Sequence, residues 1–357
     1  MNTTTDHNSI PEDSELLDLL LEDQRKNSIT FQPSEYWKPY SVRIRDELWN
    51  SGLASFRRNP RIAKGYSDVL VRDPFDLMDR TAMTWRFHKL ISWLPFVKSK
   101  VFSHYKRAIA ASQNEAVRVR SELSRFRNAD MLETHASTLA SMNTMLGSPE
   151  AYFLWSDQRI ALNYLEQLCV IENFRSEIGF DRAQSFLEIG GGFGSHAHLI
   201  LTLYPQIEKY LYIDLPPMLY VGTQYLRAHF GDSVYTYADW SKDRPDDLNQ
   251  ISNRILCLPP WCLEHCTFNW DAAFSMASFQ EMRSDQVLYY LDFLGKNAAS
   301  EDSNLALLYY RSGNNSMSLD SLEEYFQQGM KLRRFEPEAA YTPSRFVYSV
   351  ASPLIVS

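Results

Sequence analysis

Short apolar runs alternate with helix-like stretches through the second half of the chain, after Gly179. A parallel sheet covered by crossover helices produces this rhythm, because its strands are buried on both faces. The pattern therefore predicts a doubly wound α/β domain with a mostly parallel sheet. The runs are SFLEI (185–189), KYLYID (209–214), RILCLPP (254–260), WDAAFSMASF (270–279) and NLALLYY (304–310).

The last two strand candidates are RRFEPEAAY (333–341) and RFVYSVASPLIV (345–356). No long helical stretch separates them, so we expect an antiparallel pair at the edge of the sheet. SVYTY (233–237) competes with RILCLPP for the position of third strand, and the sequence leaves that choice open.

The first 180 residues favour helices. Residues 75–146 lack strand alternation, 147–152 form a turn, and 157–174 show helical spacing of apolar residues. SELLDLLLEDQRK (14–26) predicts an amphipathic helix suited to docking on a partner subunit. We divide the chain into a flexible segment (1–30), a helical domain that covers the substrate and could mediate homo-oligomerisation (31–180), and an α/β domain (181–357).

Composition excludes several classes of protein. The net charge of −8 argues against general nucleic-acid binding, and no apolar run is long enough for a membrane helix. The N-terminus lacks an apolar signal core, and four cysteines in a chain of this length indicate reduced thiols in a cytoplasmic protein. The spacing in CLPPWCLEHC (257–266) is not that of a zinc knuckle, so we predict no metal site.

Charge is distributed unevenly along the chain. Lys and Arg concentrate in residues 25–127, whereas acids dominate the remainder. Two faces that attract each other, within or between subunits, would explain this pattern. The basic region could equally attract an anionic substrate.

A glycine-rich turn follows the first predicted strand. Missing side chains let the backbone reach positive φ and approach a ligand closely. The helix that starts near Ser195 directs N–H groups and partial positive charge at that ligand. The turn should therefore bind a carboxylate or another anion; its glycines are Gly190, Gly191, Gly192 and Gly194.

Two nucleoside cofactors compete for this turn. Residues 192–197 satisfy the dinucleotide pattern G-x-G-x-x-A, which favours a nicotinamide-dependent oxidoreductase. Glu188, with glycines two, four and six residues later, instead fits S-adenosylmethionine, because its carboxylate would repel a diphosphate and attract an ammonium group. Asp214 ends the second strand and could accept both ribose hydroxyls of either cofactor. We favour S-adenosylmethionine.

Three stretches, FLEIGGGFG, YLYIDLPPMLYVGTQYL and DAAFSMASFQEM, resemble class I S-adenosylmethionine-dependent methyltransferases. More narrowly, they resemble the sugar O-methyltransferase family of antibiotic-glycoside and surface-polysaccharide gene clusters. The similarity covers residues 145–315 well and the first 140 loosely. It implies a Rossmann-like domain whose mostly parallel seven-stranded sheet has an antiparallel edge strand, preceded by a mainly helical domain.

The resemblance also assigns roles to residues. Glu188, Gly190 and Gly192 would hold the methionine end of the cofactor. Asp214 would bind the ribose and Leu215 the adenine. Ser278 and Phe279 would contact the cofactor near the methyl donor. For the adenine edge, Asp239 and the LPPW turn (258–261) are rival candidates.

A protonated sugar hydroxyl is a poor nucleophile, so the reaction needs a general base. Glu281 is our first candidate, because it follows the fourth strand at its carboxyl end, although it could instead cap a helix or pair with Arg283. His265 and His196 are the other candidates. A divalent ion could also lower the pKa of the alcohol, and the sequence leaves this open.

The sequence thus predicts an O-methyltransferase for a sugar or glycosylated small molecule, with no nucleic-acid or membrane partner. Methylation of a polyketide or peptide, and a catalytically silent partner subunit, are the alternatives. Three rings, Tyr152, Trp155 and Tyr164, are candidates to stack on the acceptor, although each could equally pack in the core.

Overall fold

The computed structural model describes residues 10–58, 131–149, 152–155, 157–310, 317–336 and 346–354. Most of the helical prediction for residues 75–146 therefore lies outside the described residues. Its last part forms the helix α5 (Met131–Ser141).

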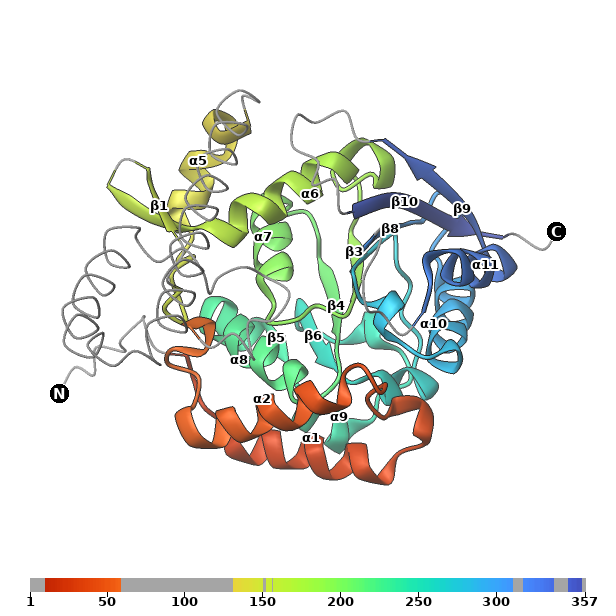
Figure 1. Cartoon of the computed structure of the whole chain (residues 1–357), viewed down its shortest axis with the longest axis horizontal. Coiled ribbons are helices and arrows are strands. Elements are labelled where there is room, and N and C mark those ends of the chain that lie inside the picture. The colour runs from red at the N-terminus through yellow and green to blue at the C-terminus, as the bar shows by residue number, and fades with distance from the viewer. Residues whose placement is uncertain are drawn as a thin grey trace, which may run out of the picture.

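A single large sheet organises the second half of the chain, with the strand order β5-β6-β4-β3-β7-β8-β10-β9 (Figure 1). The strands from β5 to β8 pair in parallel, whereas β10 runs antiparallel to both β8 and β9. This confirms the predicted fold class. The bounds are β3 (Ser185–Ile189), β4 (Lys209–Ile213), β5 (Val234–Tyr235), β6 (Ile255–Leu258), β7 (Ala272–Met276), β8 (Asn304–Tyr310), β9 (Met330–Phe335) and β10 (Phe346–Pro353).

The pairing of strands shows which of the two runs, RILCLPP or SVYTY, is the third strand. β6, from the RILCLPP run, pairs with β4, and the short β5 lies outside β6 at the edge. The last two strands form the expected antiparallel pair, with the antiparallel strand β10 one position inside the edge strand β9. The sheet is mostly parallel, as the resemblance implied, but it has eight strands because β5 is added at one edge, and its antiparallel strand β10 lies one position inside the other edge.

The predicted helix over 157–174 begins later than expected. Residues up to Ala161 form a hairpin of β1 (Tyr152–Trp155) and β2 (Gln158–Ala161), and the helix α6 spans Leu162–Ile178. Asp157 has φ of 65°, a left-handed conformation that belongs to a turn and not to a helix. The helical spacing that suggested the longer helix lies wholly within α6.

Helices cover the sheet in the alternating pattern of a doubly wound domain. α6 packs on α7 and on β8, α8 packs on β5 and β6, and α10 packs on α11. The central strands β3 and β4 are consequently almost fully buried. The helix bounds are α7 (Ser195–Leu203), α8 (Met218–Phe230), α9 (Tyr237–Asp243), α10 (Ser284–Asn297) and α11 (Leu319–Gly329).

The N-terminal segment packs on the α/β domain of its own chain. Helix α1 (Ser14–Lys26) buries one leucine-rich face and contacts α8 and α9 (Figure 1). Asp13 caps α1, its backbone N–H donates to the Tyr220 hydroxyl (3.0 Å), and its carboxylate accepts from Arg227 (3.2 Å). The described part of residues 1–30 therefore includes a helix that is docked on the α/β domain.

Residues after α1 continue along the same domain. A 3₁₀ turn (Ile29–Phe31) contacts α10, and α2 (Lys38–Ser51) follows. Helix α6, which lies before the predicted domain boundary at residue 180, packs on α7 and β8 of the α/β domain. Within the described residues, no helix combines the length and apolar character needed to span a bilayer.

Candidate active site

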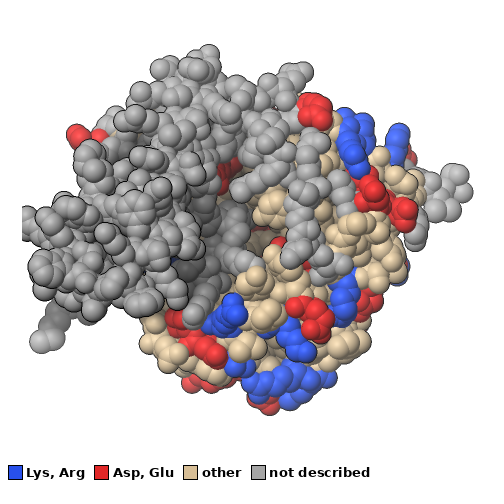
Figure 2. Space-filling model, in the orientation of Figure 1, with Lys and Arg blue, Asp and Glu red and all other residues tan. Residues whose placement is uncertain are grey.

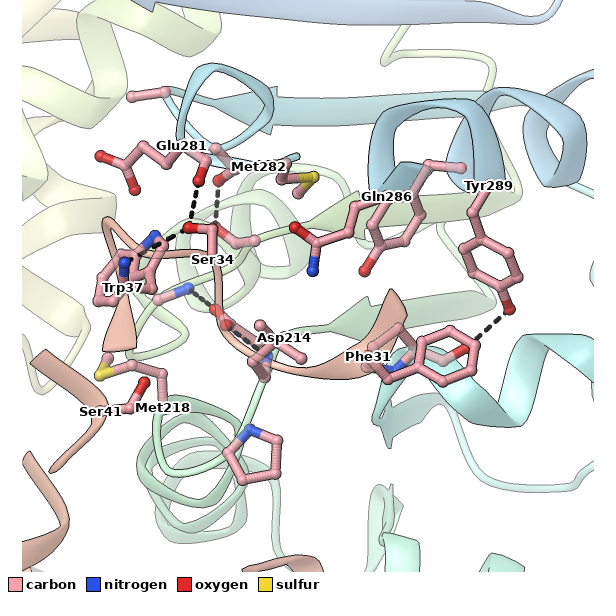
Figure 3. Close-up of a pocket in the computed structure, with 18 of the residues that line it drawn as sticks. Phe31, Ser34, Trp37, Ser41, Asp214, Met218, Glu281, Met282, Gln286 and Tyr289 are labelled. Carbon is pink, nitrogen blue, oxygen red and sulfur yellow. Dashed lines mark hydrogen bonds between the residues drawn. The ribbon is translucent and has the colours of Figure 1, made fainter. Parts of the chain in front are cut away.

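A cavity lies at the carboxyl ends of β3, β4 and β7, where the strand order reverses and open α/β sheets bind their ligands. One side is formed by the glycine turn and the residues that follow β4 and β7. The other side is formed by residues 29–41, which we call the strap (Figure 3). The strap contributes Thr30, Phe31, Ser34, Trp37 and Ser41 to the cavity wall.

Gly190 and Gly192 line the cavity with backbone alone. Gly190 has φ of 76°, and a Cβ there would approach the Ser278 hydroxyl oxygen to 2.0 Å. Ser278 itself lines the cavity, and its hydroxyl donates to the carbonyls of Met276 (3.1 Å) and Gly190 (3.3 Å). The turn after β3 is therefore fixed against the turn after β7.

Gly191 and Gly194 belong to the same turn but do not line the cavity. A Cβ at Gly191 would lie 2.0 Å from the Tyr212 ring, so this glycine permits close packing behind the turn. Gly194 has φ of 88° and caps the start of α7. Only part of the predicted glycine set therefore faces a ligand.

Asp214 occupies the centre of the cavity wall (Figure 3). Its carboxylate accepts hydrogen bonds from the backbone N–H of Gly192 (2.7 Å) and of Leu215 (2.6 Å). The pKa of Asp214 is raised to about 7, mainly by burial; the two N–H donors oppose this rise, and the nearby carboxylates of Glu188 and Glu281 add to it. Leu215, predicted beside the adenine, also lines the cavity.

Glu188 is not among the residues that line the cavity, and its contact with the cofactor ammonium group stays a prediction. It is 1% exposed, and its carboxylate accepts from the Tyr210 hydroxyl (2.9 Å). The other carboxylate oxygen lies 3.3 Å from Nδ1 of His196. Because these partners hold it beneath the glycine turn, Glu188 supports the turn from behind.

Glu281 lines the cavity, on the same side as Trp37 (Figure 3). Its backbone carbonyl accepts from the Ser34 hydroxyl (2.5 Å), which joins the strap to the turn after β7. Tyr36 hydrogen-bonds the Glu281 carboxylate; burial, then the charge of Glu281, raises the pKa of Tyr36. Arg283 does not pair with Glu281, because its guanidinium donates to the Asp285 carboxylate (3.0 and 3.1 Å).

Neither histidine candidate for the general base lines the cavity. His196 is fully buried beneath the turn, with its ring 5.0 Å from that of Phe274. His265 is exposed on the surface, where its ring lies 6.5 Å from that of Trp240. Of the three base candidates, the structure brings only Glu281 to the cavity.

Two predicted cofactor contacts also lie elsewhere. Phe279 is 2% exposed and packs its ring against those of Tyr290 and Phe326, because the chain turns it into the core. The Asp239 carboxylate caps α9 by accepting from the backbone N–H (2.9 Å) and hydroxyl (2.7 Å) of Thr236. The rival LPPW turn does reach the cavity, through Pro260.

Sequence reasoning missed the strap. Its FQPSEYWKPYS motif shows turn signals and aromatic residues, but nothing in it indicates which surface it covers. The three rings that were candidates to stack on the acceptor do not line the cavity: Tyr152 is 40% exposed, Trp155 is half-buried, and Tyr164 is fully buried. No cluster of three His, Cys, Asp or Glu side chains that could hold a metal ion occurs among the described residues.

Neither a family model nor a curated protein sequence matches this chain. Solved structures do match it. The mitomycin 7-O-methyltransferase MmcR is 13% identical over 53% of this chain and 56% of its own length, with a TM-score of 0.37. The pyocyanin biosynthetic protein PhzM is 13% identical over 54% of this chain and 57% of its own length, with a TM-score of 0.37. Human N-acetylserotonin methyltransferase, solved in complex with SAM, is 10% identical over 53% of this chain and 53% of its own length, with a TM-score of 0.37.

These alignments extend over little more than half of each protein. The fold follows from the chain itself: the order of the sheet, the glycine turn after β3 and the acidic residue after β4 define the class I methyltransferase fold.

Proposed function

We propose that the protein is an S-adenosylmethionine-dependent O-methyltransferase that acts on a hydroxyl of a sugar or glycosylated natural product. One observation supports this most strongly: a single cavity contains the bare glycine turn, Asp214 and Glu281. A nucleoside-binding wall and a candidate base thus face the same space.

The cofactor would lie along the wall formed by β3 and β4. The glycine turn leaves room for its methionine end, because Gly190 and Gly192 carry no side chain, and Asp214 suits the ribose hydroxyls. Leu215 and Pro260 provide an apolar surface for the adenine. A diphosphate would need free N–H donors in the turn, but those of Gly190 and Gly191 donate to the Ile213 carbonyl and that of Gly192 donates to Asp214.

When bound, the cofactor supplies an electrophilic methyl group on a sulfonium ion. The protein must hold the acceptor oxygen in line with that methyl group and keep water out. Glu281 is placed to take the proton from the attacking hydroxyl onto its carboxylate. Its backbone is held by Ser34 and its side chain by Tyr36, so the base would have a fixed orientation.

Calorimetry with S-adenosylhomocysteine and with NAD tests the cofactor class. We expect the first to bind and the second not to bind. Asp214→Ala should weaken S-adenosylhomocysteine at least tenfold, about 1.4 kcal/mol, because the ribose loses its acceptor. Binding of NAD alone would refute the proposal, and binding of neither compound would favour a catalytically silent subunit.

Glu281→Gln tests the base. We expect the affinity for S-adenosylhomocysteine to survive and turnover of a methylated acceptor to fall roughly a hundredfold, because the amide cannot accept the proton. Glu264→Gln is the matched control, since Glu264 is exposed and does not line the cavity. Turnover in the Glu281 variant equal to that of the control would remove Glu281 as the base.

A non-sugar acceptor is the second candidate. Part of the cavity wall is aromatic or thioether in character, from Tyr289, Tyr290, Met276 and Met282. Such a wall also suits a planar polyketide or an aromatic peptide side chain. Mass spectrometry of reactions with one acceptor of each kind would separate the two candidates.

A further inference from the structure

Helix α8 contains a glycine at an interior position. Gly222 lies five residues into the helix, where glycine is less favourable than alanine, so a packing reason is expected. A Cβ at Gly222 would lie 2.0 Å from the hydroxyl oxygen of Tyr212. The glycine therefore makes room for the end of the Tyr212 side chain.

Tyr212 extends from β4 into a space between two glycines. Gly222 borders its hydroxyl, and a Cβ at Gly191 would lie 2.0 Å from its ring. These glycines come from different elements, helix α8 and the turn after β3. The hydroxyl donates to the Gly192 carbonyl in that turn. Both missing side chains thus let one phenol reach the back of the glycine turn.

Both backbone polar groups of Gly192 are consequently engaged. Its carbonyl accepts from Tyr212, and its N–H donates to the Asp214 carboxylate (2.7 Å). Gly192 has φ of 63°, a conformation that glycine adopts easily but has no side chain to hold. Because a hydrogen bond on each side of the residue restricts φ and ψ, the turn keeps one conformation beside Asp214.

This support comes from inside the molecule. Figure 2 shows Lys and Arg interspersed with Asp and Glu over the described outer surface, whereas Tyr212 is fully buried. A hydrogen bond in such surroundings is electrostatically stronger than one at the surface. Tyr210 lies two residues earlier, on the same face of β4, and donates to Glu188 (2.9 Å). Two hydroxyls of one strand therefore hold the turn from behind.

We propose that Tyr212 is a positioning residue for the cofactor site: its hydroxyl holds the Gly192 carbonyl and thereby keeps the glycine turn in the conformation that binds the cofactor. Gly222 is the complementary position, because its missing side chain admits that hydroxyl. The inference rests on the proposed function, in which the turn receives the methionine end of S-adenosylmethionine. Tyr212 acts through the turn, since it does not itself line the cavity.

Tyr212→Phe removes the hydroxyl and leaves the ring. Calorimetry on the full chain should show S-adenosylhomocysteine bound at least fivefold more weakly, about 1 kcal/mol, because the turn loses one of its two restraints. Tyr348→Phe is the matched control. Tyr348 is also a buried tyrosine of the sheet, on β10, and its hydroxyl accepts from Asn173 (3.3 Å), but it does not line the cavity.

The pH dependence of binding separates positioning from support of the fold. The Gly192 N–H lowers the pKa of Asp214, which is about 7. A turn released by Tyr212→Phe should donate less persistently, so the midpoint of S-adenosylhomocysteine binding should move to higher pH by about half a unit. A hydroxyl that only stabilises the fold would lower the melting temperature and leave this midpoint unchanged.

Gly222→Ala tests the same contact from the other side. The new methyl group should displace the Tyr212 hydroxyl and weaken S-adenosylhomocysteine at least fivefold, although alanine favours the helix. Gly295→Ala is the control, because a Cβ at this exposed position in α10 would meet no described atom within 4 Å. In the double variant with Tyr212→Phe the two losses should not multiply, since both remove one hydrogen bond.

Three results would overturn the inference. They are an affinity of Tyr212→Phe equal to that of Tyr348→Phe, an unchanged pH midpoint in Tyr212→Phe, and fully multiplicative losses in the double variant. Failure of the wild type to bind S-adenosylhomocysteine would instead refute the proposed function.

Discussion

Asp214 is the residue whose ionisation should control cofactor binding. Its pKa of about 7 means that the carboxylate is mostly protonated at pH 6 and mostly ionised at pH 8. Only the ionised form accepts hydrogen bonds from both ribose hydroxyls while it also accepts from Gly192 and Leu215. We expect the affinity for S-adenosylhomocysteine to rise about tenfold from pH 6 to pH 8.

Asp214→Asn is the control for that pH dependence. The amide keeps the shape of the side chain and has no proton to lose in this range, so its weaker affinity should not vary with pH. Calorimetry at four pH values in one buffer series would measure both slopes. A wild-type slope that persists in the variant would assign the titration to another group.

At the scale of residues, the sequence predicted some of the positions that line the cavity but not the orientation of every side chain. Gly190, Gly192, Asp214 and Glu281 follow strands at the carboxyl edge of the sheet, where the topology alone brings them together. Glu188 precedes the turn in the sequence, yet Tyr210 and His196 hold its carboxylate beneath the backbone. Which way a side chain points from the end of a strand depends on partners that sequence spacing does not reveal.

The strap is the element that encloses the cavity. Gln286 on α10 donates to its carbonyls at Thr30 (2.8 Å) and Gln32 (3.0 Å), and Ser34 ties it to Glu281. Phe31 anchors it between the rings of Tyr289 and Trp261. These contacts fix the strap as one wall of the cavity, opposite the glycine turn.

Gln286→Ala should therefore loosen the strap. The variant loses two hydrogen bonds to the strap, each contributing about 1 kcal/mol, so we expect S-adenosylhomocysteine to dissociate faster, by up to about thirtyfold. Stopped-flow fluorescence can follow this step, because Trp37 lines the cavity. Gln250→Ala, at an exposed position, is the control. A dissociation rate equal to that of the control would mean that the strap does not limit release.

At the scale of elements, strands were easier to predict than the segments between them. The sheet strands are continuous apolar runs because both of their faces are buried, and this signal survives in the sequence. The β1–β2 hairpin was missed because four-residue strands beside a helix resemble an extension of that helix. The position of the strap could not be predicted, because it depends on contacts with α10, far along the chain.

A buried polar cluster connects distant parts of the whole molecule behind the glycine turn. Arg57 is fully buried, donates to Asn163 (2.6 Å) and lies 5.1 Å from the ring of Phe193 in that turn. Beside it, the His198 ring stacks on His229 with centroids 3.6 Å apart. Burial, then the charge of Arg57, lowers the pKa of His229 to about 4.

This histidine should make the fold sensitive to acid. An unfolded chain protonates His229 near pH 6.5, but the folded chain resists protonation until about pH 4. The unfolded state therefore binds more protons in this window, and the free energy of unfolding should fall by up to about 3 kcal/mol as the pH drops from 6.5 to 4. The pKa of His198 is also lowered, mainly by burial. This shift should likewise reduce the free energy of unfolding as the pH drops.

Urea unfolding at several pH values would measure the effect. His229→Gln should flatten the dependence between pH 4 and 6.5, whereas His265→Gln, at an exposed position, should leave it as in the wild type. An identical pH dependence in both variants would mean that His229 is not responsible.

Because of the strap, cofactor binding and acceptor binding would depend on different parts of the chain. Residues 185–310 hold the groups proposed to grip the cofactor, whereas about a dozen residues near the N-terminus supply the facing wall. Exchange of that short stretch between related chains could redirect the enzyme to a new acceptor without rebuilding its cofactor site. Conversely, a chain without the strap would keep the glycine turn and Asp214 but would leave their ligands open to solvent on that side.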